Sequence, residues 1–245
     1  MVDEALARSF EGIGADYDRY RPGFPSVAAD AIVPGHVGVA LDLGAGTGKF
    51  TEHLVDRADR VIAVEPSAAM LEVLREKLPT AEALEGNAEQ IPVEDAVVDV
   101  VAVAQAFHWF DRVRACAEIA RVLRPGGTLG LLWNRSDPSC SWDTAAARVI
   151  HPAVGDDDET TGSTSEELAG FRFERLETFH WSEPITRDDY LARWSTVSTF
   201  LVAPPSGKAA MTAAIEEILE ADAATRGLDG FELPHLTDVY LYTRV

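Results

Sequence analysis

Cysteine is nearly absent from this chain of 245 residues. Cys116 and Cys140 are its only two cysteines. Two isolated thiols exclude a disulfide framework and a cysteine-based metal site. A reducing compartment is the simplest setting for such a chain. The sequence therefore predicts a cytoplasmic protein with no bound metal.

Long apolar runs are also missing. The longest, from Val97 to Ala106, is interrupted by Asp99 and is far too short to span a bilayer. The N-terminus carries Asp3 and Glu4 and lacks the apolar stretch of a secretory leader. These absences predict a protein that is neither exported nor held in a membrane.

Positive charge is scarce. Lys and Arg number 21 against 41 Asp and Glu, which gives a formal net charge of −20. Proteins that bind DNA or RNA cluster their basic residues against the phosphates. The nearest approach to a cluster is the set Arg112, Arg114, Arg121 and Arg124, whose spacing is typical of a solvated helix face beside Glu118. The acidity therefore argues against a nucleic-acid partner and favours solubility.

What the chain does contain is a regular alternation of short apolar runs and amphipathic segments. The run Val97–Val103 is typical of a strand buried on both faces, and Ser67 is placed to cap a following helix. The pattern predicts strands at 37–43, 60–64, 81–84, 97–103 and 128–133, and helices at 50–57, 67–78 and 113–123. Such alternation predicts βαβ units in an α/β fold with a Rossmann-like, doubly wound sheet.

The pattern changes after Asn134. Residues 136–165 are polar and include the acidic run Asp156 to Glu159, which predicts a surface loop or an ill-ordered segment. Further on, the sequence predicts strands at 171–182 and 239–244, with helices at 187–201 and 207–224 between them. Two late strands separated by a pair of helices are unusual at the end of a dinucleotide-binding domain.

The segment Leu41–Gly48 carries the strongest chemical signal. A strand delivers Asp42 to a glycine-rich turn, and the turn opens a helix, so a ligand can approach the backbone closely. A dinucleotide fingerprint, G-x-G-x-x-G, would need its third glycine where Lys49 stands. Glu65 ends the next strand, about 20 residues on, where an acid can accept both ribose hydroxyls. A nicotinamide-dependent oxidoreductase remains the alternative at this point.

The loop Glu85–Glu89 follows the third predicted strand. The carboxyl ends of parallel strands meet at one edge of a sheet, so this polar loop is placed to contact the edge of a purine. An ordinary turn is the other interpretation.

Two further local sequences point to a known family. They are Tyr17–Pro25 (YDRYRPGFP) and Phe107–Asp111 (FHWFD). With the glycine-rich turn they make the chain, over residues 10–135, resemble a class I S-adenosylmethionine-dependent methyltransferase of the methyltransferase-11 type, similar to the trans-aconitate methyltransferase-like proteins. The resemblance implies the strand order 3-2-1-4-5-7-6, with the last strand antiparallel and a helical cap inserted late in the chain. It also implies S-adenosyl-L-methionine as cofactor and S-adenosyl-L-homocysteine as product.

The resemblance also implies roles for individual residues. The glycine-rich turn would line the methionine part of the cofactor, Glu65 would hold the ribose, and Asn87 would meet the adenine, although relatives often carry Asp there. Gln105 would lie beside the methionine end through its backbone. The full set of cofactor positions is Tyr17, Asp42, Gly44, Ala45, Gly46, Glu65, Ser67, Met70, Asn87, Ala88, Glu89 and Gln105.

The acceptor side is less well defined. A positioned base is needed only if the acceptor must lose a proton, and His108 is the candidate; otherwise it packs among the neighbouring aromatic rings. The expected substrate-binding residues are Tyr20, Arg21, Trp109, Trp133 and Trp194, with core packing as the alternative for the cap aromatics.

The chain as a whole is expected to be one domain, 1–245. Residues 1–30 would form a lid, 36–135 the cofactor half, and 136–245 the late strands with a helical substrate cap. It would act as a monomer or homodimer on a small-molecule acceptor with an O, N or C nucleophile, a carboxylate being one candidate. A protein that binds the cofactor without transferring methyl is the remaining alternative.

Overall fold

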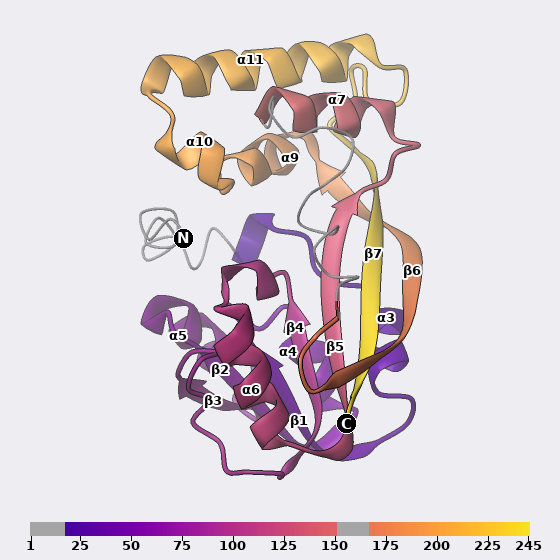
Figure 1. The fold of residues 1–245 in the computed structure, drawn as a ribbon. Helices are drawn as coiled ribbons and strands as arrows, with labels where there is room; N and C mark the ends of the chain where they lie inside the picture. Colours follow the sequence, from indigo (N-terminus) through magenta and orange to yellow (C-terminus); the bar gives the residue numbers. More distant parts are fainter. Residues whose placement is uncertain (1–17, 151–166) are drawn as a thin grey trace.

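The computed structural model describes residues 18–150 and 167–245, and its centre is one seven-stranded sheet (Figure 1). The strands are β1 Val37–Leu43, β2 Ala58–Glu65, β3 Glu82–Glu85, β4 Val98–Ala104, β5 Leu123–Ser136, β6 Phe171–Thr186 and β7 Gly230–Arg244. Their order is β3-β2-β1-β4-β5-β7-β6. The first five pair in parallel, whereas β7 runs antiparallel to both β5 and β6. The predicted fold, strand order and direction of the last strand are confirmed.

Helices cover both faces of the sheet, because successive side chains of its buried strands point alternately to one face and to the other. Leu41 and Val101 face the core that includes α6 (Arg112–Val122). Ala40 and Val100 face the core that includes α3 (Ser26–Ile32) and Leu54 of α4 (Thr51–Val55). The remaining helix of this half, α5 (Ala68–Lys77), begins at Ser67, whose side chain accepts the Met70 N–H as predicted. The sheet is therefore doubly wound.

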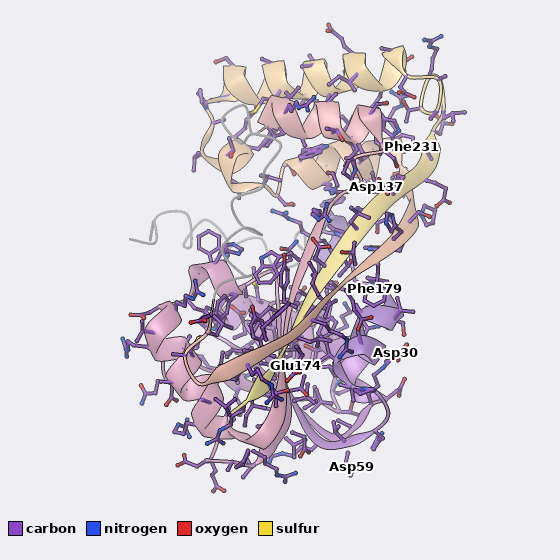
Figure 2. The ribbon with its side chains drawn as sticks, turned by 45° about the vertical axis from the view of Figure 1, so that its right-hand side comes forward. Asp30, Asp59, Asp137, Glu174, Phe179 and Phe231 are labelled. Atoms are coloured by element: carbon purple, nitrogen blue, oxygen red, sulfur yellow. The ribbon has the colours of Figure 1, made fainter. Side chains whose placement is uncertain are left out.

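The last three strands extend beyond the others and support a cap of helices (Figure 1). The cap consists of α7 Ser141–Ile150, α9 Arg187–Trp194, α10 Ser198–Val202 and α11 Pro205–Ala221. Its side chains form a hydrophobic core of their own, which includes Trp142, Tyr190 and Ile215. Figure 2 labels Asp137 and Phe231 at this end of the molecule and Asp59 at the opposite end.

Two predictions for the cap segment were wrong. Residues 141–150, expected in a surface loop, form α7, because Trp142, Ala146 and Ile150 recur every four residues and bury one face of the helix together with Asp143. The helix expected at 187–201 is broken between α9 and α10. There the Thr196 hydroxyl donates to the Arg193 carbonyl at 2.7 Å, an alternative to continued helix bonding. The acidic run Asp156–Glu159 lies outside the described residues.

No helix of the described residues is both long and apolar enough to cross a bilayer.

Candidate functional site

The glycine-rich turn after β1 contains three glycines with positive φ, at 44, 46 and 48. Two of them are enclosed. A Cβ on Gly44 would lie 2.6 Å from the Ala106 Cβ, and one on Gly48 would lie 3.0 Å from side-chain carbons of α5 and Leu78. Gly46 differs, because among the described residues a Cβ there would meet only the Met70 Sδ, at 3.9 Å. The space above Gly46 is therefore where a ligand can reach the backbone.

Glu65 holds this turn from the end of β2. Its Oε2 accepts the Gly46 N–H at 3.0 Å, and its Oε1 accepts the Ser67 N–H at 2.9 Å. Burial raises the pKa of Glu65, while these two hydrogen bonds oppose the shift. Each carboxylate oxygen has a second lone pair, so Glu65 can still accept a hydrogen bond from a hydroxyl group of a ligand. The structure thus brings together Gly46, Glu65, Ser67 and Met70, four of the predicted cofactor positions.

Asp42 adds a second carboxyl beneath the turn. It is only 1% exposed, and its Oδ2 accepts a hydrogen bond from the Thr51 hydroxyl at 2.6 Å. Burial raises the pKa of Asp42 to about 7, the Thr51 bond opposes this, and the charge of Glu65 adds to it. Within the described residues its Oδ1 has no hydrogen-bond partner. A positively charged ligand above the turn would be attracted by both carboxyls.

The loop after β3 is built around Glu89. This carboxylate accepts the Asp111 N–H at 2.8 Å, and Asp111 in turn caps α6 by accepting two N–H groups. Ala88 is buried, whereas Asn87 is exposed. Glu89 therefore fixes the loop against α6, and its predicted contact with a purine, like that of Asn87, stays a prediction.

The end of β4 carries backbone strain. Gln105 has φ of 56°, a conformation that residues other than glycine seldom adopt and that concentrates at functional sites. Two bonds to the end of β5 hold it there. Its N–H donates to the Leu132 carbonyl at 2.9 Å, and its Nε2 donates to the Asn134 carbonyl at 3.0 Å.

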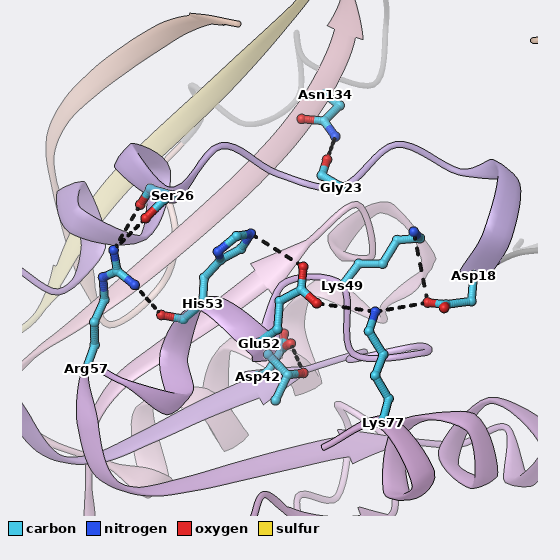
Figure 3. Close-up of polar contacts among 11 residues, drawn as sticks. Asp18, Gly23, Ser26, Asp42, Lys49, Glu52, His53, Arg57, Lys77 and Asn134 are labelled. Carbon is cyan, nitrogen blue, oxygen red and sulfur yellow. Dashed lines mark hydrogen bonds and ion pairs between the residues drawn. The ribbon is translucent and has the colours of Figure 1, made fainter. Parts of the chain in front are cut away.

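Asn134 links this strained residue to the segment before α3. Its side-chain Nδ2 donates to the Gly23 carbonyl at 2.8 Å, as Figure 3 shows, and its Oδ1 accepts the Thr237 hydroxyl at 2.6 Å. Thr237 also accepts the Trp181 Nε1–H at 2.9 Å. No motif marks Thr237 or Trp181, because only strand pairing brings β6 and β7 to this place.

The segment before α3 is also tied to the cap, to α5 and to the end of the glycine-rich turn. Arg21 donates to the Thr196 carbonyl, between α9 and α10, at 3.0 Å. Asp18 contacts Lys77 at 3.2 Å and Lys49 at 3.9 Å (Figure 3). Burial lowers the pKa of Lys49, with Asp18 opposing. The Arg19 guanidinium lies over the Tyr20 ring, with its Cζ 5.0 Å from the ring centroid. Tyr17 lies outside the described residues.

The candidate base and its neighbour follow β4 in a single turn of 3-10 helix, Phe107–Trp109. His108 is exposed, and its ring centroid lies 4.8 Å from that of the half-buried Trp109. Phe107 belongs to the core. His108 is therefore accessible to solvent, and its role as a base stays a prediction.

Two of the residues expected to bind substrate are instead packed in hydrophobic cores. Trp133 is 2% exposed and meets Tyr240 edge to face at 5.6 Å. Trp194 is 5% exposed and meets Tyr190 in the same way at 5.9 Å, inside the cap. Neither indole presents an open surface to an acceptor, because the alternation along β5 and the periodicity of α9 turn both inward.

Within the described residues no group of three His, Cys, Asp or Glu side chains could hold a metal ion.

Comparisons with known proteins extend the geometric argument. A family model described as a methyltransferase domain matches residues 41–131. The uncharacterised methyltransferase Rv3342 of Mycobacterium tuberculosis is 36% identical over 232 residues, which cover 95% of this chain and 94% of that protein. The uncharacterised methyltransferase-like protein C25B8.10 of Schizosaccharomyces pombe is 31% identical over 245 residues, covering 97% and 96%.

A solved structure has the same fold. It is assigned as a type II methyltransferase from Anaeromyxobacter dehalogenans and aligns with a TM-score of 0.72 at 24% identity, covering 92% of this chain and 97% of that one.

Proposed function

Because the chain belongs to the class I S-adenosylmethionine-dependent methyltransferases of the methyltransferase-11 type, we propose that it methylates a small-molecule acceptor at the site above Gly46. The observation that carries the site assignment is the pairing of Gly46 with Glu65 beside open space. The specific likeness to trans-aconitate methyltransferases stays a prediction.

The residues present fit the cofactor. The open side of Gly46 admits a ligand, the Glu65 oxygens retain lone pairs for ribose hydroxyls, and the Asp42 Oδ1 is a buried acceptor near a positively charged ligand. When bound, S-adenosylmethionine supplies a methyl group on a sulfonium, which is electrophilic without further activation. The chain therefore has to orient the acceptor, and orientation of this kind can lower a barrier by about 7–11 kcal/mol.

Three parts of the chain would share that task. The strained backbone of Gln105 fixes the end of β4, and the contacts of Arg21 and Gly23 hold the lid segment between sheet and cap, where it would exclude water. His108 is the candidate base for an acceptor that must lose a proton. Residues 36–135 would thus hold the cofactor, while residues 1–30 and the cap would enclose the acceptor.

The net charge of −20 supports a small molecule, rather than a nucleic acid, as the acceptor. The two isolated cysteines are buried and free, which supports a reducing, cytoplasmic setting.

Titration calorimetry with S-adenosylhomocysteine and with NAD tests the cofactor. We expect the first to bind and the second not to, and the reverse result would restore the oxidoreductase. Transfer of a labelled methyl group to a metabolite panel then tests the reaction. Tight cofactor binding without transfer to any compound would favour a protein that binds the cofactor but does not react.

A further inference from the structure

Strand β6 forms one edge of the sheet, next to β7 and with no strand beyond it in the described order. It is 16 residues long and runs along the side of the molecule (Figure 1). An edge strand leaves a row of backbone N–H and C=O groups available for pairing with another chain. The side chains of its first half decide whether such pairing is favoured.

Two apolar side chains lie exposed on this edge. Phe173 and Leu176 are each 46% exposed. Their partners across the sheet, Tyr242 and Tyr240, are buried in the core that includes α6. The Phe173 ring lies 5.3 Å from that of Tyr242. The hydrophobic core therefore reaches the sheet edge at these two residues and is only half covered there.

A β-bulge puts these two residues on the same face. Residues three apart in a regular strand point to opposite faces, but the register of β6 against β7 shifts between Phe173 and Arg175. Glu174 is the extra residue. The shift carries Leu176 to the face of the sheet that Phe173 also occupies.

The charged residues of the same stretch lie on the other face. Arg172 binds Glu174 at 2.7 Å, and Arg175 binds Glu177 at 2.6 Å. The Glu174 carboxylate accepts hydrogen bonds from Thr243 and Arg172, and these bonds lower its pKa. Thr243 is the cross-strand partner of Arg172, so Glu174 lies on the same face as these two residues. Apolar and charged side chains are thus segregated along the edge.

Residues 172–177, Arg-Phe-Glu-Arg-Leu-Glu, are complementary to themselves in an antiparallel pair. If two copies pair about the peptide bond between Glu174 and Arg175, Glu174 of each copy faces Arg175 of the other copy. Phe173 then faces Leu176 of the second copy on the apolar face. Arg172 faces Glu177 of the second copy on the charged face. Opposite charges and apolar pairs at directly opposed positions stabilise strand pairing.

We propose that two copies of this chain form a homodimer by antiparallel pairing of their β6 edges about Glu174 and Arg175, which makes one continuous sheet across both. A twofold pair of this kind uses the edge of both copies, so assembly stops at the dimer. Figure 2 labels Glu174 away from the cap end, where Asp137 and Phe231 lie, so the interface would leave the cap free.

Sedimentation velocity over a concentration series tests the pairing through charge reversal. The wild-type protein should sediment as a species with twice the chain mass of 26.5 kDa. Arg175→Glu sets two pairs of acids against each other and Glu174→Arg two pairs of bases, so each variant alone should raise the dimer dissociation constant at least about tenfold. An equimolar mixture of the two variants restores both opposite-charge pairs and should dimerise again.

Arg114→Glu, at an exposed position of α6, makes the same charge change elsewhere and should leave the dimer intact. Near-ultraviolet circular dichroism of each variant confirms that it is folded. A wild-type chain that is monomeric at 100 µM protein, a concentration we choose for the test, would overturn the proposal. So would a dimer that both reversals leave unchanged, or variants that remain monomeric when mixed.

Discussion

The carboxylate of Glu65 accepts the backbone N–H of Gly46 at 3.0 Å, so the end of β2 fixes the turn that follows β1. The two residues are 19 positions apart and meet because β1 and β2 pair in parallel with Leu43 opposite Val64. This contact joins the acidic residue expected to hold a ribose to the glycine of the turn that the described residues crowd least.

Glu65→Ala should weaken S-adenosylhomocysteine binding by about 1–3 kcal/mol, because it removes a charged hydrogen-bond acceptor and loosens the turn. Titration calorimetry measures the loss. Glu82→Ala, on the neighbouring strand β3 and paired with Arg60, is the matched control and should leave affinity unchanged. A folded Glu65→Ala protein with wild-type affinity would remove the ribose assignment.

Gly46→Ala and Gly48→Ala should separate binding from folding. Both positions have positive φ, so each substitution costs about 1–2 kcal/mol in backbone strain. The Gly46 methyl enters the ligand space and should reduce cofactor affinity at least about tenfold with a modest loss of stability. The Gly48 methyl meets Leu74 and Leu78 at 3.0 Å and should lower the melting temperature more.

The measurements for this pair are thermal unfolding and calorimetry on both variants. Valine at Gly46 is a poor probe, because a β-branched residue at this φ strains the backbone in addition to blocking the ligand. Equal affinity in Gly46→Ala and wild type would mean that the turn serves the fold alone.

The buried carboxyl of Asp42 should make stability depend on pH. Its pKa is about 7 in the folded chain against an ordinary 3.8. The folded chain therefore keeps a proton that the unfolded chain has released, so the free energy of unfolding falls as pH rises from about 4 to about 7. Asp42→Asn should flatten this part of the stability curve, measured by urea unfolding at several pH values.

The same carboxyl should couple cofactor binding to proton release. A cationic ligand favours the ionised form of Asp42, so affinity should rise with pH as pH approaches 7. Calorimetry in two buffers of different ionisation enthalpy counts the protons. The pKa of Glu65 is raised as well, and Asp42→Asn isolates the contribution of Asp42. Binding heats that are equal in both buffers for wild type near pH 6 would contradict the coupling.

His108→Asn should lower kcat by about 10²-fold with cofactor affinity unchanged, if the acceptor loses its proton to this exposed imidazole. His36→Asn is the control, because His36 is exposed and contacts Asp59 at the end of the molecule remote from the cap. Full activity in His108→Asn would mean that His108 is not the base and that the chain accelerates the reaction by orienting the acceptor.

The cofactor half was predictable because its signals are local. The Ser67 cap, the alternating strands and the glycine-rich turn each depend on neighbours in sequence, and the structure has them at the predicted places, with strand ends shifted by a few residues. The strand order followed from the family resemblance. The different surroundings of the three glycines could not be predicted, because they depend on Ala106 and Leu74, which lie in other parts of the chain.

The cap was harder to predict because one of its helices is short and many of its contacts are long-range. Helix α7 buries Trp142, Ala146 and Ile150, but it lies within residues 136–165, whose other polar and acidic residues favour a loop. The inward packing of Trp133 on β5 depends on Tyr240 of β7, and the link from Asn134 to Thr237 joins residues 103 positions apart. Sequence neighbours carry no information about such pairs.

The separate hydrophobic core of the cap bears on how this protein can evolve. Trp142 and Tyr190 pack against Phe231 at the start of β7, far along the chain's fold from the turn at Gly46. Distant sites without common contacts contribute to stability nearly independently. Mutations can accumulate there without loosening the turn at Gly46. The matched family model ends at residue 131, before the first cap helix. The segment that carries the glycine-rich turn and the segment that carries the cap can therefore change in sequence at different rates.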